Sequence, residues 1–250
     1  MIEARNLSKS FGANSVLEGV SLGIQEGESV VVIGRSGGGK SILLKLLIGL
    51  IKPDTGQVLI EGQDIVPMNE RQLLPVRRKF GMLFQGAALF DSMTVAENVA
   101  FAFRRDRSLP PEQIARRVAD VLEMVDLPGI QDKNPSELSG GMKKRVGLAR
   151  AIIYQPQIIL YDEPTTGLDP MVSDSIDHLI LRVRDCLRVT TVVVTHDMRS
   201  ARRLGQRILM LHDRRIYAAG SPDEIFGSTD PVVRRFTEGV SDLKAEGCRL

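Results

Sequence analysis

A glycine-rich segment at residues 34–41 constrains the fold of this chain more than any other feature. It follows the pattern G-x-x-x-x-G-K-[ST], whose glycines let successive backbone N–H groups converge on phosphate oxygens. A β-branched run at residues 28–33 precedes it, and apolar residues at helical spacing follow it. An ordinary glycine-rich turn could match the pattern by chance. The order of strand, loop and helix is the context that a phosphate-binding loop requires, so we expect one here.

This loop and the helix after it offer groups suited to a nucleoside triphosphate. We expect Lys40 to place a positive charge at the β- and γ-phosphates, and the Ser41 hydroxyl to hold Mg²⁺. The start of the helix adds the positive end of its dipole. The candidate phosphate-binding residues are Gly34, Arg35, Ser36, Gly37, Gly38, Gly39, Lys40 and Ser41.

Two later strands also end in polar side chains. An apolar segment at residues 157–161 leads into Asp162 and Glu163, at the rim where ligands of doubly wound sheets bind. We expect Asp162 to hold Mg²⁺, directly or through water, and Glu163 to orient or deprotonate the attacking water. A third strand ends at His196, which we expect to reach the γ-phosphate. A lone histidine after a strand is more often an ordinary surface residue.

Composition narrows the class of protein. The chain has 250 residues with a net charge of +2, so charge alone does not indicate a nucleic-acid partner. Its longest apolar run, residues 42–51, contains Lys45 and is about half of the roughly 20 residues that span a bilayer. Cys186 and Cys248 have neither metal-site nor redox spacing, which favours a reducing compartment. We therefore expect a chain that does not itself cross a membrane.

Strand and helix patterns alternate in the second half of the chain. Buried-strand patterns at residues 157–161, 190–195 and 208–211 are separated by helical patterns at residues 172–184 and 198–204. This alternation predicts an α/β fold with a mostly parallel sheet and helices on both faces.

The order of these segments resembles the ATP-binding-cassette (ABC) ATPase domain over nearly the whole chain. The deciding segment is LSGGM at residues 138–142, which is similar to the family's LSGGQ signature. The resemblance implies that Phe11 stacks on adenine, and it adds Val16 to the nucleotide-binding set. It also implies that Gln85 is the Q-loop glutamine at the metal site. Asp169 then belongs to the D-loop that contacts nucleotide, and His196 is the switch histidine.

Two positions depart from the family pattern. Met142 replaces the glutamine of the signature, and phenylalanine replaces the commoner tyrosine at position 11. Neither change removes a backbone donor or the stacking face, so we keep both roles.

The resemblance also implies the architecture. It is that of a P-loop NTPase with a RecA-like core of mostly parallel strands, an N-terminal antiparallel β subdomain and a helical subdomain. We expect the ATP-binding core with its antiparallel subdomain at residues 1–85 and 155–227. The helical subdomain with the signature takes residues 86–154, and a loosely docked tail takes residues 228–250.

The signature has a physical interpretation apart from the family name. Ser139, Gly140 and Gly141 open a helix with a hydroxyl cap and side-chain-free amides, which is an anion site in its own right. The resemblance implies that this site meets the nucleotide of a second copy arranged head to tail, with two ATP molecules buried. The plain alternative is that Ser139 only caps a core helix.

A finer resemblance covers residues 84–99 and the segments DEPTTGLDP and VRRF. These look like the ATPases of MCE-type lipid transport systems, the Mla group that moves phospholipid between bacterial inner and outer membranes. This resemblance implies integral membrane permease subunits as partners, and an MCE-type lipid-binding subunit reached through the permease. It implies a peripheral position on the cytoplasmic face of the inner membrane. Its alternative is a plain structural connection after Gln85 that happens to be apolar.

Three other functions share parts of this pattern. An ABC importer ATPase for another solute has every catalytic motif, and only the apolar segment after Gln85 argues against it. A soluble ABC protein acting on nucleic acid is less favoured, because the chain has one cassette, no heptad run and near-neutral charge. A P-loop kinase would leave Ser139 and its glycines unexplained. The transported substrate and its direction do not follow from the sequence.

Overall fold

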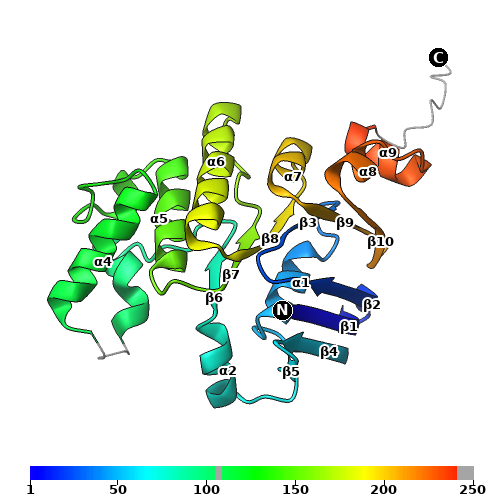
Figure 1. Ribbon diagram of the computed structural model, residues 1–250, viewed down its shortest axis with the longest axis horizontal. Coiled ribbons are helices and arrows are strands. Elements are labelled where there is room, and N and C mark those ends of the chain that lie inside the picture. The colour runs from blue at the N-terminus through cyan, green and yellow to red at the C-terminus, as the bar shows by residue number, and fades with distance from the viewer. Residues whose placement is uncertain (105–108, 241–250) are drawn as a thin grey trace.

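The computed structural model describes residues 1–104 and 109–240, which form two β-sheets with surrounding helices (Figure 1). The larger sheet has the strand order β10-β9-β3-β8-β7-β6. Its strands are β3 (Ser29–Gly34), β6 (Phe80–Leu83), β7 (Ile158–Asp162), β8 (Thr190–Thr195), β9 (Arg207–His212) and β10 (Arg215–Gly220). All neighbours from β9 to β6 run parallel, and only β10 runs antiparallel. The predicted mostly parallel sheet is confirmed.

The smaller sheet comes from the N-terminal part of the chain and is antiparallel, with the order β2-β1-β4-β5. Its strands are β1 (Ile2–Phe11), β2 (Asn14–Ile24), β4 (Thr55–Ile60) and β5 (Gln63–Asp64). Gly12, with φ +60°, makes the tight turn between β1 and β2 that its sequence predicted. The hairpin is longer than the sequence pattern suggested, and this brings Phe11 to its tip.

Strand β3 divides the core between the two faces of the larger sheet. Val31 and Ile33 join a cluster that includes apolar residues of α6 (Pro170–Leu187) and α7 (Met198–Leu204). Val30 and Val32 join a second cluster, with α1 (Lys40–Leu47) and the antiparallel sheet. Because successive side chains of a strand point to opposite faces, an unbroken apolar run such as β3 requires cover on both sides.

A group of helices follows β6 and extends the molecule at one end, where α4 and α5 lie beyond α6 (Figure 1). These elements are α3 (Val95–Val99), η1 (Ala100–Arg104), α4 (Pro111–Met124), η2 (Pro135–Glu137) and α5 (Gly140–Ile152). Helix α5 packs on β6, and its apolar face shares the core cluster of α6. The signature helix is therefore joined to the larger sheet by direct packing.

The sequence patterns missed several short elements, including α2 (Glu70–Arg77) and α8 (Pro222–Phe226). The expectation of a loosely docked tail is wrong for α9 (Pro231–Glu238), whose Val233 is buried in the core. The apolar face of this short helix, formed by Val232, Val233 and Phe236, was overlooked in its sequence. Residues 241–250, with Cys248, lie outside the described part of the chain. Within the described ranges, no helix has the length and apolar character to cross a membrane.

Candidate functional site

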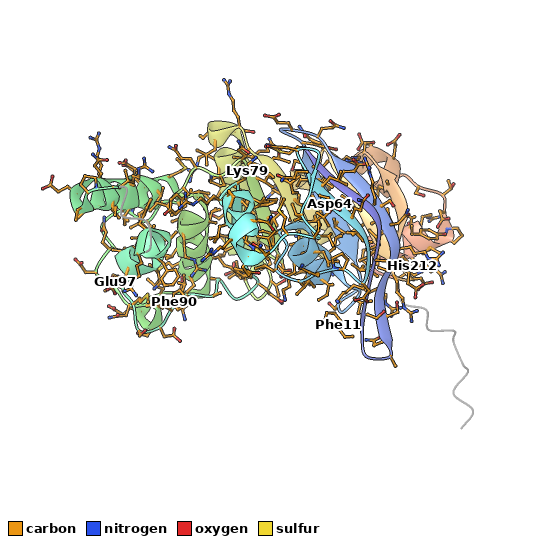
Figure 2. All side chains as sticks on the ribbon, turned by 90° about the horizontal axis from the view of Figure 1, so that it is seen from below. Phe11, Asp64, Lys79, Phe90, Glu97 and His212 are labelled. Atoms are coloured by element: carbon orange, nitrogen blue, oxygen red, sulfur yellow. The ribbon has the colours of Figure 1, made fainter. Side chains whose placement is uncertain are left out.

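A pocket of about 410 Å³ opens where the glycine-rich loop meets the carboxyl ends of β7 and β8. It is lined by Phe11, Val16, Ser36, Gly37, Gly38, Gly39, Lys40, Ser41, Ile42, Gln85, Glu163, Thr166 and His196. Most of the predicted nucleotide-binding residues thus meet in one place. Phe11 is 49% exposed at the hairpin tip, beside the strands of the antiparallel sheet (Figure 2), and the Lys9 ammonium lies 5.3 Å from its ring centroid.

The loop turns sharply between β3 and α1. Gly37 has φ +74° and Gly39 has φ +95°, which favour glycine. A Cβ on Gly39 would also lie 2.9 Å from Val16 Cγ1. Gly39 precedes α1 without a side-chain cap, so the first N–H groups of the helix have no partner within the helix. Together with the helix dipole they form an anion site.

Lys40 is buried beneath this loop. Its Nζ donates to the carbonyl oxygen of Gly34 at 2.8 Å and to that of Arg35 at 3.1 Å. The same ammonium lies 3.3 Å from Glu163 Oε1. Gly34 and Arg35 therefore reach the site through their carbonyls, and the ammonium stands between the loop and the end of β7.

Ser41 lines the pocket, and the buried Asp162 lies behind it and does not line the pocket. The Ser41 hydroxyl donates to Asp162 Oδ1 at 2.6 Å. Gln85 also lines the pocket. A hydroxyl, a carboxylate and an amide carbonyl are all oxygen donors of the kind that Mg²⁺ takes together with phosphate oxygens and water. This donor set fits Mg²⁺.

Glu163 is the most constrained of the predicted catalytic residues. Its backbone has φ +49°, a left-handed conformation that costs about 1–2 kcal/mol in a residue with a side chain. Its buried carboxylate lies beside Lys40. Through Oε2 it accepts from Thr166 Oγ1 at 3.1 Å and contacts His196 Nδ1 at 2.8 Å. A carboxylate that lines this pocket can accept a proton from a bound water.

The signature and D-loop residues lie elsewhere, and none of them lines this pocket. Ser139 caps α5, with its Oγ accepting from Met142 N at 3.3 Å. Asp169 caps α6 through Oδ1. The two glycines allow close packing here, because a Cβ on Gly140 would lie 3.3 Å from Leu168, and one on Gly141 would lie 2.7 Å from Val172. Ser139 and Gly140 remain exposed.

Sequence reasoning missed three residues around the pocket. Thr166 donates a hydrogen bond to the Glu163 carboxylate. Ile42, two residues after Lys40, lines the pocket. Lys144 is buried behind the site, and its Nζ donates to the carbonyl oxygen of Glu163 at 3.1 Å. A signal for Lys144 was present, because it follows Gly141 by three residues and so falls on the buried face of α5.

Comparison with known proteins agrees with this geometry. Residues 17–166 match the family model described as ABC transporter. The chain is 38% identical over 242 residues to the intermembrane phospholipid transport system ATP-binding protein MlaF of Escherichia coli K12, covering 97% of this chain and 90% of that one. It is 42% identical over 238 residues to a ribonucleotide transport ATP-binding protein, mkl, of Mycobacterium leprae, covering 95% and 69% of the two chains.

A third relative is the chloroplast protein TRIGALACTOSYLDIACYLGLYCEROL 3 of Arabidopsis thaliana, which is 40% identical over 259 residues, covering 97% of this chain and 74% of that one. Among solved structures, a dimeric ATP-binding cassette in a post-hydrolysis state with ADP and phosphate superimposes with a TM-score of 0.81. It is 34% identical, and the match covers 89% of this chain and 99% of the other. With the fold, the pocket and these relatives in agreement, the chain belongs to the ABC transporter family of ATP-binding ATPases.

Proposed function

We propose that two copies of this chain bind two Mg-ATP molecules head to tail and hydrolyse them to drive a membrane permease that moves phospholipid. The observation that carries the catalytic part is the Glu163 carboxylate, held between Lys40 and His196 at the edge of the phosphate pocket. Support for the dimer comes from the exposed Ser139 and Gly140, which form an anion site away from the pocket of their own chain. A related cassette has been solved as a dimer with ADP and phosphate.

Each predicted residue has a task in this proposal. The loop amides and Lys40 bind the β- and γ-phosphates, and Phe11 stacks on the adenine with Val16 below it. Glu163 accepts the proton of the attacking water, while His196 and Thr166 orient its Oε2. From the second copy, Ser139, Gly140 and Gly141 donate to the γ-phosphate, and Asp169 lies next to them. When bound, Mg²⁺ neutralises developing phosphate charge, and Ser41, Asp162 and Gln85 would hold it.

The permease contact is proposed for the segment after Gln85. Phe90 and Phe101 are exposed there, with their ring centroids 4.4 Å apart. Figure 2 shows Phe90 among the helices, on the other side of the molecule from Phe11. An exposed aromatic pair is typical of a protein contact surface. A permease seated here would connect to the nucleotide pocket through Gln85.

Phospholipid is favoured as the substrate by the relatives. The phospholipid transport ATPase MlaF of Escherichia coli aligns over 90% of its own length, and the plant relative is named for a glycolipid. The mycobacterial relative is named for ribonucleotide transport and aligns over 69% of its length. In the lipid system we propose, the chain is peripheral on the cytoplasmic face of the inner membrane, with an MCE-type lipid-binding subunit beyond the permease. Residues 86–154 form a subdomain that carries the signature to the second copy.

Two experiments test these parts separately. For catalysis, phosphate release by the full chain with Mg-ATP is compared with that of K40A, which removes the only ammonium lining the described pocket. We expect K40A to abolish nucleotide binding or turnover, and unaltered affinity would contradict the phosphate site.

For transport, the complex is extracted from its own membranes in detergent, and its subunits and bound lipid are identified by mass spectrometry. We expect an integral subunit and phospholipid. Recovery of an integral subunit with a different solute would leave the ATPase intact and refute the lipid assignment.

A further inference from the structure

A buried cation, Lys144 on α5, lies directly behind the nucleotide pocket. It is only 5% exposed. Its Nζ donates to the carbonyl oxygen of Gln85 and, at 3.1 Å, to that of Glu163. One ammonium therefore joins three segments that are far apart in sequence: the signature helix, the second residue after β6 and the residue after β7.

The position of this ammonium is electrostatically demanding. Burial lowers the pKa of Lys144, whereas the nearby Asp162 and Glu163 charges raise it. A charged lysine side chain is rarely buried unless it is paired or hydrogen-bonded, because desolvation disfavours the charged form. A neutral apolar side chain would fill the same space on α5 without that cost. The oxygens that accept from Lys144 belong to the backbone of two pocket-lining residues. Lys144 therefore fixes the backbone geometry of these two residues.

Glu163 needs such support more than its neighbours do. Its left-handed backbone is strained, and such conformations persist only where the surroundings fix them. The N–H of Glu163 donates to the carbonyl of Val194 at 2.9 Å, and its own carbonyl accepts from Lys144. With both sides of the residue held, the carboxylate is directed towards Lys40 and His196.

The segment after Gln85 is held by the same helix. Ala87 and Ala88 are also left-handed, with φ +58° and +49°. Arg150, six residues after Lys144 on α5, donates to the carbonyls of Ala88 at 2.7 Å and Ala87 at 2.6 Å. Gly147 lies between the two cations, and a Cβ there would lie 2.8 Å from Leu83 and 3.2 Å from Ala87. Helix α5 thus fixes this strained segment at three successive turns.

We propose that Lys144 is a positioning residue for hydrolysis: it fixes the backbone of Glu163 and Gln85 to the helix that begins at Ser139. The inference rests on the proposed catalytic role of Glu163. A displacement of α5, whether by a second copy at Ser139 or by a permease at the segment after Gln85, then reaches the Glu163 backbone through a single ammonium. Among the described residues Lys144 makes no hydrogen bond to the glycine-rich loop, so we expect it to affect hydrolysis more than ATP binding.

The test compares K144M with K144R and with the neighbouring control K143M in the full chain. Met removes the donor and keeps the apolar stem, Arg retains charge and donors, and Lys143 lies on the same helix turn but is not buried. We expect K144M to lower kcat at least tenfold, with KM and the Kd for ATP within threefold of wild type. K144R should recover at least a third of the wild-type kcat, and K143M should match wild type. A kcat for K144M within twofold of wild type would overturn the inference.

Because K144M removes a donor from the carbonyls of Gln85 and Glu163, and leaves Glu163 with the Thr166 N–H at 3.3 Å, K144Q is measured beside it as a neutral variant that keeps one donor group. We expect its kcat to lie between those of K144M and wild type. A double-mutant cycle with E163Q then separates positioning from general damage. If Lys144 acts through Glu163, K144M lowers the residual turnover of E163Q by less than twofold. A further loss as large as in wild type refutes positioning.

The same data distinguish a failure of the proposed function from a failure of the role proposed for Lys144. If wild type does not hydrolyse ATP, or if E163Q turns over at the wild-type rate, the proposed function itself fails. If wild type and E163Q behave as expected but K144M does not, only the role of Lys144 fails.

Discussion

Replacing Glu163 by glutamine tests the site most directly, because it removes one charge and keeps the shape of the side chain. In the structure the carboxylate competes for Lys40, since Oε1 lies 3.3 Å from its ammonium. At an effective dielectric constant of 20, this separation corresponds to a gross Coulomb attraction of about 5 kcal/mol. E163Q removes this attraction and leaves the ammonium available to phosphate. We therefore expect ATP to bind E163Q at least as tightly as wild type.

Turnover should change in the opposite direction. A general base contributes about 10²–10⁴-fold to a rate, which is about 3–5 kcal/mol of transition-state stabilisation. We expect the kcat of E163Q to fall by that factor. Phosphate release at saturating Mg-ATP gives kcat, and isothermal titration gives the Kd for ATP. T166V is measured beside E163Q: because it removes a neutral donor that orients the same carboxylate and keeps the charge, its kcat should fall less than that of E163Q. A kcat of E163Q within threefold of wild type, or a Kd raised tenfold, would refute the reasoning.

Three further changes test other parts of the structure. F11A removes the exposed ring at the hairpin tip. It should weaken ATP binding roughly 5- to 150-fold, as expected for about 1–3 kcal/mol of stacking, and leave the unfolding midpoint of the protein the same. An unchanged Kd for ATP would exclude stacking. G39A places a Cβ 2.9 Å from Val16, on a backbone with positive φ that disfavours a side chain. It should cost about 1–3 kcal/mol in stability or ATP affinity. Thermal unfolding with and without nucleotide measures this cost. Burial raises the pKa of Asp177 to about 6, above its unfolded value of about 4. The native state therefore keeps this proton to higher pH than the unfolded state does. The free energy of unfolding should fall by up to about 3 kcal/mol as the pH rises from about 4 to about 6. D177N should remove this part of the pH dependence in urea unfolding at pH 4.5 and 7, whereas an unchanged slope would assign it to other groups.

Local patterns were sufficient for the regular parts of the molecule. The β-branched run before the glycine-rich loop predicted β3, and the helical spacing after it predicted α1. Strand β8 and helix α7 have the bounds that their patterns gave. Short elements such as α2, α8 and α9 were not recognised. A helix of five to eight residues shows at most about two turns of apolar spacing, which is often too little to identify it from the sequence alone.

The sequence alone determined the chemistry of the nucleotide pocket, because that chemistry depends on residue types at fixed spacing. Glycines at positions 37 and 39 permit the turn, and Lys40, Asp162 and Glu163 supply the charges. Only the tertiary structure decided how these charges are held. The left-handed backbone of Glu163, the hydroxyl of Thr166 and the buried ammonium of Lys144 meet because α5, β7 and β8 pack together. Hydrogen bonds of this kind depend on distances between separate elements, and these distances are set by core packing rather than by neighbours in the chain.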